Sequence, residues 1–411
     1  MKKYWNSELI INIQSIIAFF MLMFYISIYP INFLLAKFIN VEIFSITKLL
    51  FVFIVLYFMF NIKYKNFYIN KNNFISIIVF LFILIIVIKS LFNSDSFTLY
   101  KISNKYMTMY DYHIYFLGSV LVPILSMIIV GNEYKKICGF KNNNLIKNIV
   151  IALYFIEIIL IIYVKLRYYN ISGQALLEES GKHLFLGDSF VVLTFIILNL
   201  IKNNINKNLI VLISLITLYL IGSRSAFFLF IILVIVKFIF EKLTRKKCIE
   251  IGIILIIISI ISCYILIPVY QGKKSNLINN RVFTLVFNTD DDHSLNSREE
   301  LNEVGIRVIK ENPLLGNLFY EIEEYKITGR YIHNVLGYWA EFGFFVFIII
   351  FINILIKLIK ALKNYLRGKD TSYINSLIII FCLSALFSRS YNNAFIWLAL
   401  TLNYSIGEVE K

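Results

Sequence analysis

Long apolar runs alternate with short polar segments along most of the chain. Runs such as Ile75–Ile88, Val191–Leu200 and Ile251–Ile267 contain at most isolated polar groups. Segments of roughly 18 to 20 such residues are long enough to cross a bilayer as helices. The pattern predicts an all-α integral membrane protein with about twelve spans, at roughly residues 9–29, 43–61, 74–92, 112–131, 146–165, 184–201, 208–222, 225–240, 249–268, 335–356, 373–388 and 391–407.

One long polar stretch, Gln271–Asn334, interrupts this pattern. It divides the chain into spans one to nine in residues 1–270, a large loop in 271–334, and spans ten to twelve in 335–411. Two polar gaps are so short that each predicts a helical hairpin, at Gly222–Arg224 and at Ser388–Tyr391.

Composition and charge support a membrane protein and orient it. The 411 residues are 59% hydrophobic and 16% charged, which is more apolar surface than one soluble core could bury. A net charge of +15 would suggest nucleic acid in a soluble protein, but here the basic residues flank the apolar runs. With the N-terminus inside, the inner segments carry more than twice as many Lys and Arg as the short outer segments. The bias predicts a multi-pass cytoplasmic membrane protein with both termini in the cytoplasm, an extracytoplasmic 271–334 loop and no nucleic-acid partner.

The outer loop contains one strong helical pattern. Ser297 and Glu300 have the spacing of a capping box, and an apolar face follows, formed by Leu301, Val304, Gly305 and Val308. Glu311-Asn312-Pro313 ends the helix, because the residue before proline avoids the α region. We expect an amphipathic helix beginning at Ser297, lying on the outer membrane surface and shielding a site.

Three arginines are candidates for anion binding. Arg298, in the first turn of that helix, opposes the helix dipole, which points to an anion as its partner, although a solvated surface arginine fits the position equally well. Arg224 occupies a tight turn between Ser223 and Ser225, which suits a phosphate, although an interfacial anchor has the same position. Arg389 lies in the second hairpin. A run of acidic residues at Asp290–Asp292 fits either a cation site or, with better odds, a solvated turn.

The loop ends on His333-Asn334, directly before an apolar span. Asn334 is suited to cap that span, and a neutral histidine at the membrane edge can act as a general base, although it can equally be a bystander. Glu341 lies two turns further on, where a carboxylate is costly unless it is paired. By depth, its expected partners are Arg224 and Arg389.

At these residues the sequence resembles the bacterial O-antigen and capsular polysaccharide polymerases and the related O-antigen ligases. Three ordered motifs carry the resemblance, namely Gly222–Ser225, Ser297-Arg298 with the helix leading into Asn312–Gly316, and His333-Asn334 followed by Trp339–Gly343. The motifs cover roughly the last half of the chain; the first half matches in topology alone. The sequence departs from the family at Gly316-Asn317-Leu318, where a second glycine is common.

The resemblance implies a GT-C-like, metal-independent glycosyltransferase that needs no cofactor and acts on polyprenyl-diphosphate-linked oligosaccharide at the outer face of the membrane. By position, Arg224 and Arg298 correspond to the diphosphate-binding cations and His333 to the catalytic base, with Asn334, Arg389 and Glu341 as further substrate-binding candidates. Expected partners are the lipid bilayer, and a flippase and chain-length regulator of the same pathway.

Three alternatives to a polymerase stay open. An O-antigen ligase would transfer the finished chain to lipid A core and would carry the same motifs. A lipid-linked polysaccharide flippase would need charges lining a cavity and commonly symmetric halves, whereas this chain has few charges within its spans and a single long outer loop. A sensor or structural membrane protein would make the motifs accidental.

Overall fold

The fold is a bundle of apolar helices, described here from a computed structural model. The structure describes residues 2–39, 46–64, 73–94, 100–102, 105–139, 143–169, 182–201, 204–240, 293–327, 329–367 and 373–402. The predicted span 249–268 and the acidic run Asp290–Asp292 lie outside the described residues.

The first half of the chain forms long helices, several of which continue through a single π-helical turn. They are α1 (Lys2–Met23), η1 (Phe24–Ile28), α2 (Tyr29–Ile39), α3 (Ile46–Tyr64), α4 (Phe74–Phe92), α5 (Met109–Phe116), η3 (Leu117–Leu121), α6 (Val122–Gly139), α7 (Asn144–Val164), η5 (Lys165–Tyr169) and α8 (Lys182–Leu200). A short antiparallel hairpin, β1 (Tyr100–Ile102) and β2 (Lys105–Met107), precedes α5 and pairs Lys101 with Tyr106. The hydrophobic pattern did not predict this hairpin.

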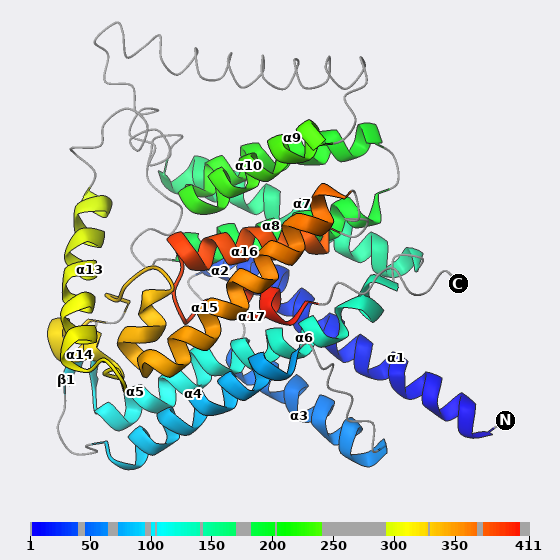
Figure 1. The fold of residues 1–411 in the computed structure, drawn as a ribbon. Helices are drawn as coiled ribbons and strands as arrows, with labels where there is room; N and C mark the ends of the chain where they lie inside the picture. The colour runs from blue at the N-terminus through cyan, green and yellow to red at the C-terminus, as the bar shows by residue number, and fades with distance from the viewer. Residues whose placement is uncertain are drawn as a thin grey trace, which may run out of the picture.

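The second half carries the predicted site. It contains α9 (Asn204–Ile221), α10 (Arg224–Phe240), α13 (His293–Glu311), α14 (Tyr320–Tyr325), α15 (Leu336–Leu366), α16 (Ile374–Phe387) and α17 (Ala394–Thr401). Figure 1 shows α13 and α14 gathered beside α5 and the hairpin at one end of the bundle, whereas the start of α1 lies at the opposite end. The residues of the outer loop that the structure describes therefore meet one end of the helices.

Every predicted span other than 249–268 overlaps a helix, and both predicted hairpins are present. Within the described residues, six helical segments are long and apolar enough to cross a membrane, and several shorter apolar helices accompany them. The structure thus confirms an all-α membrane protein, and the number of about twelve spans stays a prediction.

The amphipathic helix of the loop is confirmed as α13, but its start is not at Ser297. The helix already begins at His293, so Ser297 lies inside it and does not cap it. Its apolar face is buried, with Leu301 8% and Val308 3% exposed. This face packs on the segment before α15: a Cβ added to Gly305 would lie 2.1 Å from Cδ1 of Ile332.

The 312–317 loop of the outer segment fills a break in the hydrogen bonding of α15. Gly343 has a φ of +83° and a ψ of 177°, which interrupts the helix. The Ala340 carbonyl therefore accepts from Asn317 N–H at 2.7 Å, and Phe344 N–H donates to the Leu314 carbonyl at 3.2 Å. An unbroken helix would pair these two α15 groups with each other, so the 312–317 loop replaces one turn of helical hydrogen bonding.

The close contact of this loop with α15 requires glycine on both sides. A Cβ on Gly316 would lie 2.6 Å from Gly343 N, and a Cβ on Gly343 would lie 2.2 Å from the Leu314 carbonyl oxygen. Trp339 adds a third tie, because its Nε1–H donates to the Pro313 carbonyl at 2.8 Å. The motif Asn312–Gly316 and the motif Trp339–Gly343 are therefore two halves of one structural unit.

Candidate active site

A buried ion pair joins α8 to the turn between α16 and α17. Arg389, in the turn between α16 and α17, donates from Nε to Asp188 Oδ2 at 2.7 Å and from Nη2 to Asp188 Oδ1 at 2.9 Å. Asp188 belongs to α8 and is 2% exposed, and Arg389 is 5% exposed. A bidentate pair of this kind fixes the orientation of both side chains.

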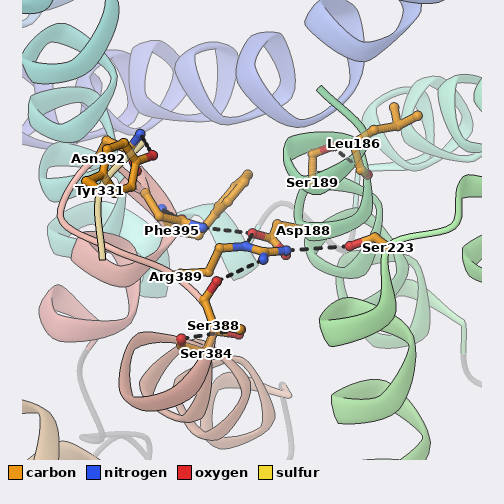
Figure 2. Close-up of polar contacts among 11 residues, drawn as sticks. Leu186, Asp188, Ser189, Ser223, Tyr331, Ser384, Ser388, Arg389, Asn392 and Phe395 are labelled. Carbon is orange, nitrogen blue, oxygen red and sulfur yellow. Dashed lines mark hydrogen bonds and ion pairs between the residues drawn. The ribbon is translucent and has the colours of Figure 1, made fainter. Parts of the chain in front are cut away.

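The same pair reaches the turn that precedes α10. Arg389 Nη2 also lies 3.5 Å from Ser223 Oγ, and its Nη1 donates to the Ser388 carbonyl at 3.1 Å. Asn393 Nδ2 donates to Asp188 Oδ2 at 2.8 Å, so the carboxylate has a partner at each oxygen. Figure 2 shows Arg389 extended between Asp188 and Ser223.

Gly187 allows the turn to approach α8 this closely. A Cβ added there would lie 2.5 Å from the Cβ of Ser223. Arg224 follows Ser223 directly and begins α10, so the first motif lies against the Asp188–Arg389 pair through the Ser223 side chain.

His333 lies under the influence of two arginines from distant parts of the chain. Burial, together with the positive charges of Arg298 and Arg389, lowers the pKa of His333 to about 4. Burial contributes most to this change in pKa, and the two positive charges act in the same direction because they oppose protonation of the imidazole. The imidazole is consequently neutral at physiological pH, which is the form that can accept a proton.

Aromatic rings hold the histidine from the other side. The ring of Tyr331 lies 5.1 Å from that of His333 and 5.1 Å from that of Tyr391, centroid to centroid. Asn392 donates from its amide to the Tyr331 hydroxyl. The N-cap of α15 is Val335, one residue after the predicted cap Asn334, and Asn334 Oδ1 accepts from the N–H of Leu336, the first donor of the helix, at 2.9 Å.

The predicted pairing of Glu341 with Arg389 is wrong. Glu341 accepts from Phe319 N–H at 2.6 Å and from the Tyr391 hydroxyl at 3.3 Å, whereas Arg389 pairs with Asp188. The sequence singled out Glu341 and Arg389 correctly as groups that need partners, but depth along a helix does not say which face each side chain occupies.

Several residues of this region were not predicted from the sequence as part of the site. Asp188 was visible as a carboxylate within an apolar span, and that isolation was its signal. Glu321 and Tyr331 had no such signal, because acidic and aromatic residues are common in a polar loop, and Tyr391 had none because tyrosines are also common where a span begins. Phe319 has a φ of +65°, the left-handed region that glycine favours, close to where a second glycine was expected.

Among the described residues, no group of three or more His, Cys, Asp or Glu side chains is arranged to hold a metal ion. The cationic and neutral groups of this region, Arg298, Arg389 and His333, are instead suited to an anionic ligand beside a proton acceptor.

The fold and this region together define a multi-pass helical membrane protein with a neutral histidine and a buried arginine–aspartate pair among its helices. Residues 209–351 match a family model described as O-antigen ligase. The match confirms the predicted resemblance to the O-antigen ligase and polymerase family, which implies a glycosyltransferase-like membrane enzyme of O-antigen assembly with a lipid-linked polysaccharide substrate. No curated protein and no solved structure gave a significant match.

The matched segment contains Arg224, Arg298, His333 and Glu341, and it ends before Arg389. Asp188 lies before it. The buried ion pair therefore consists of two residues outside the matched segment that contact it through Ser223.

Proposed function

We propose that this protein polymerises polyprenyl-diphosphate-linked oligosaccharide units into O-antigen or capsular polysaccharide at the outer face of the cytoplasmic membrane. The family match supports a lipid-linked saccharide substrate. The observation that carries the proposal, beside that match, is the lowered pKa of His333, which burial and the positive charges of Arg298 and Arg389 keep neutral. Cations beside a neutral base fit a reaction in which a diphosphate leaves and a hydroxyl is deprotonated.

The proposed reaction needs both kinds of group. The acceptor hydroxyl oxygen bonds to the anomeric carbon of the donor, and the bond from that carbon to the diphosphate oxygen breaks. The electron pair leaves with the diphosphate, where Arg224 and Arg298 offset its charge, and the hydroxyl proton passes to His333. A guanidinium can bind such a group through two parallel hydrogen bonds, which fixes the leaving group as well as neutralising it.

Substrate binding should also tune the base. In the free protein the two arginines oppose protonation of His333. A bound diphosphate brings negative charge beside the same arginines and reduces that opposition, so the basicity of His333 rises when the substrate is present. The proton acceptor thus becomes stronger at the step that requires it.

We do not assign Arg389 to direct binding of the substrate. Each of its three guanidinium nitrogens already donates to a protein acceptor, so we assign Arg389 to positioning the Ser223-Arg224 turn. Asn334 orients the start of α15 beside His333, and Glu341 anchors the segment at Phe319, which leaves Arg224, Arg298 and His333 as the proposed contacts to substrate.

The test is the length distribution of surface polysaccharide in the source cells. Chromosomal His333→Ala should abolish long chains while the protein stays inserted at normal abundance, measured by immunoblotting of membranes. Arg298→Lys should be nearly as harmful because the planar fork is lost, whereas Arg307→Lys, on the exposed face of the same helix, is the matched control. Normal chain-length ladders in His333→Ala cells would remove the histidine from the mechanism.

A second candidate, transfer of a finished chain by an O-antigen ligase, is favoured by the description of the matched family. Deleting the gene separates the two. Loss of a polymerase leaves single repeat units on the lipid carrier, whereas loss of a ligase leaves long polymer on that carrier. Mass spectrometry of the extracted polyprenyl-linked saccharides distinguishes these outcomes.

A further inference from the structure

Two buried carboxyl groups meet where α14 docks onto α15. Glu321 and Glu341 are each 1% exposed. The Tyr391 hydroxyl lies 3.4 Å from Glu321 Oε2 and 3.3 Å from Glu341 Oε1, and each carboxyl group is also a hydrogen-bond partner of the other. Neither residue contacts the substrate in the reaction proposed above.

Few hydrogen-bond donors serve the two buried carboxyl groups. Glu321 accepts from the Tyr112 hydroxyl at 3.1 Å and from Gly329 N–H, and Glu341 accepts from Phe319 N–H at 2.6 Å. Tyr391 has one hydroxyl proton for two carboxyl groups. If both were ionised, the contact between the two carboxyl groups would contain no proton and would be repulsive.

The described residues that hydrogen-bond to this pair carry no positive charge. The hydrogen-bond partners of both carboxyl groups within the described residues are hydroxyls, backbone N–H groups and each other. His113 on α5 is engaged with the Met109 carbonyl and Ser90 Oγ, and Arg389 is engaged with Asp188. The other titratable groups facing the pair are the phenols of Tyr112, Tyr320, Tyr331 and Tyr391, which are neutral at ordinary pH.

The pair is linked to His333 by a short path. Tyr320, which precedes Glu321, accepts from Ile332 N–H at 3.0 Å through its hydroxyl, and Ile332 precedes His333. Phe319, whose N–H is bound by Glu341, inserts between the rings of Tyr112, His113 and Phe116 at centroid distances of 4.8, 4.8 and 4.9 Å. The docking of α14 therefore fixes the backbone from which His333 projects.

We propose that Glu321 and Glu341 share one proton and that this shared-proton pair is a pH-sensitive latch, which docks the 317–333 segment on α15 and positions His333. The proposal rests on the proposed function only for the catalytic meaning of His333. Both glutamates are positioning residues. The docked segment holds the proton, and the segment loosens as the pH rises.

The sign and range of the effect follow from linkage. Burial raises the pKa of Glu321 from 4.5 to about 7 in the docked state. The docked form binds more protons than the open form between these values, so docking is strongest in acid and weakens as pH rises toward 7. With these two values, the equilibrium constant for opening should increase about 20-fold between pH 5.5 and pH 7.5 and then level off.

Cysteine labelling measures this opening without any substrate. Ile322 is 1% exposed and lies on α14 beside Glu321, and Ile327 is 41% exposed just beyond the helix. The full-length protein carrying Ile322→Cys is labelled with a maleimide in nanodiscs between pH 5.5 and 8.5, with the parent protein as the background. The rate is divided by that of Ile327→Cys, which removes the pH dependence of the thiol itself.

The proposal expects this ratio to rise about 20-fold to pH 7.5 in the parent background and to stay flat when Glu321→Gln is added. Glutamine imitates the protonated acid and can donate its amide proton to Glu341. Glu324→Gln, on the exposed side of the same helix, should leave the rise unchanged. If Glu321→Gln does not insert, Glu341→Gln takes its place, since either glutamine supplies the missing proton.

Two results would overturn the latch: a flat ratio in the parent protein, or an equal rise in the glutamine variant. Either result leaves the proposed reaction intact, because labelling does not depend on catalysis. Loss of long polysaccharide in His333→Ala cells with no pH-dependent labelling would therefore support the reaction and reject the latch. Normal polysaccharide in those cells with pH-dependent labelling would support the latch and reject the reaction.

Discussion

Replacing Asp188 by leucine should destabilise the protein far more than breaking a surface ion pair of the same length. The Arg389 Nε–Asp188 Oδ2 distance and the Arg307 Nη2–Glu324 Oε2 distance are both 2.7 Å. The side chains of the first pair are 6% and 3% exposed, and those of the second are 52% and 39% exposed. Burial is therefore the main difference between the two pairs.

The expected magnitudes differ accordingly. Asp188→Leu leaves a guanidinium buried without its countercharge, which should cost about 3–5 kcal/mol of unfolding free energy. Glu324→Leu leaves Arg307 in contact with water, so it should cost about 0–1 kcal/mol. Adding Arg389→Met to Asp188→Leu removes the stranded charge and should recover most of the loss, because an apolar pair of similar volume can replace a buried ion pair.

The assay is equilibrium unfolding of the purified full-length protein in mixed micelles with increasing SDS, followed by circular dichroism. The parent protein, Asp188→Leu, Arg389→Met and the double variant form a double-mutant cycle. The cycle measures the coupling free energy between residues 188 and 389. The reasoning fails if Asp188→Leu costs no more than Glu324→Leu, or if the two buried substitutions are additive.

Three further predictions concern the loop in α15, the turn before α10 and the base. Gly343→Ala should lower the unfolding free energy by about 1–3 kcal/mol from backbone strain alone, and the contact with Leu314 should add to this loss. Gly118→Ala should be tolerated, because a Cβ there meets nothing within 4 Å. Equal effects of the two substitutions in the same SDS titration would contradict the role of the loop. Arg224→Lys should shorten surface polysaccharide on gels because a lysine cannot form the bidentate contact, and full-length chains would argue against a diphosphate ligand. Burial and the charges of Arg298 and Arg389 lower the pKa of His333 from 6.5 to about 4, so the acid limb of kcat/KM should lie near pH 4. For the same reason, the folded state should lose stability as the pH falls from 6.5 through 4. An acid limb centred at pH 6.5 would show that His333 titrates normally.

The sequence predicted the helices well where polarity alone decides. The span predicted at 74–92 coincides with α4, and the gap at Gly222–Arg224 with the end of α9 and the start of α10. The start of α13 was misplaced by the capping pattern at Ser297, because a serine and a glutamate with that spacing also occur inside helices. The break at Gly343 was not predicted, since glycine inside an apolar run does not by itself end a membrane helix.

The sequence could not predict which buried side chains contact one another. The convergence of Arg298 and His333 stays a prediction; the positive charge of Arg298 is one cause of the lowered pKa of His333, after burial. The partners of Arg389 and Glu341 depended on which helix faces lie together, and the alternatives were similar in depth. Only the arrangement of α8, α14 and the turn before α17 shows that Arg389 faces Asp188 and that Glu341 faces Glu321.

The shared hydrogen bonding between the 312–317 loop and the broken turn of α15 bears on how such proteins can be recombined. Each part supplies the backbone groups that the other lacks, so a crossover placed between them would join halves from two parents whose surfaces have not been matched. Chimaeras that exchange donor specificity should keep residues 312–344 from a single parent and place their junctions in the flanking helices, where each backbone satisfies itself.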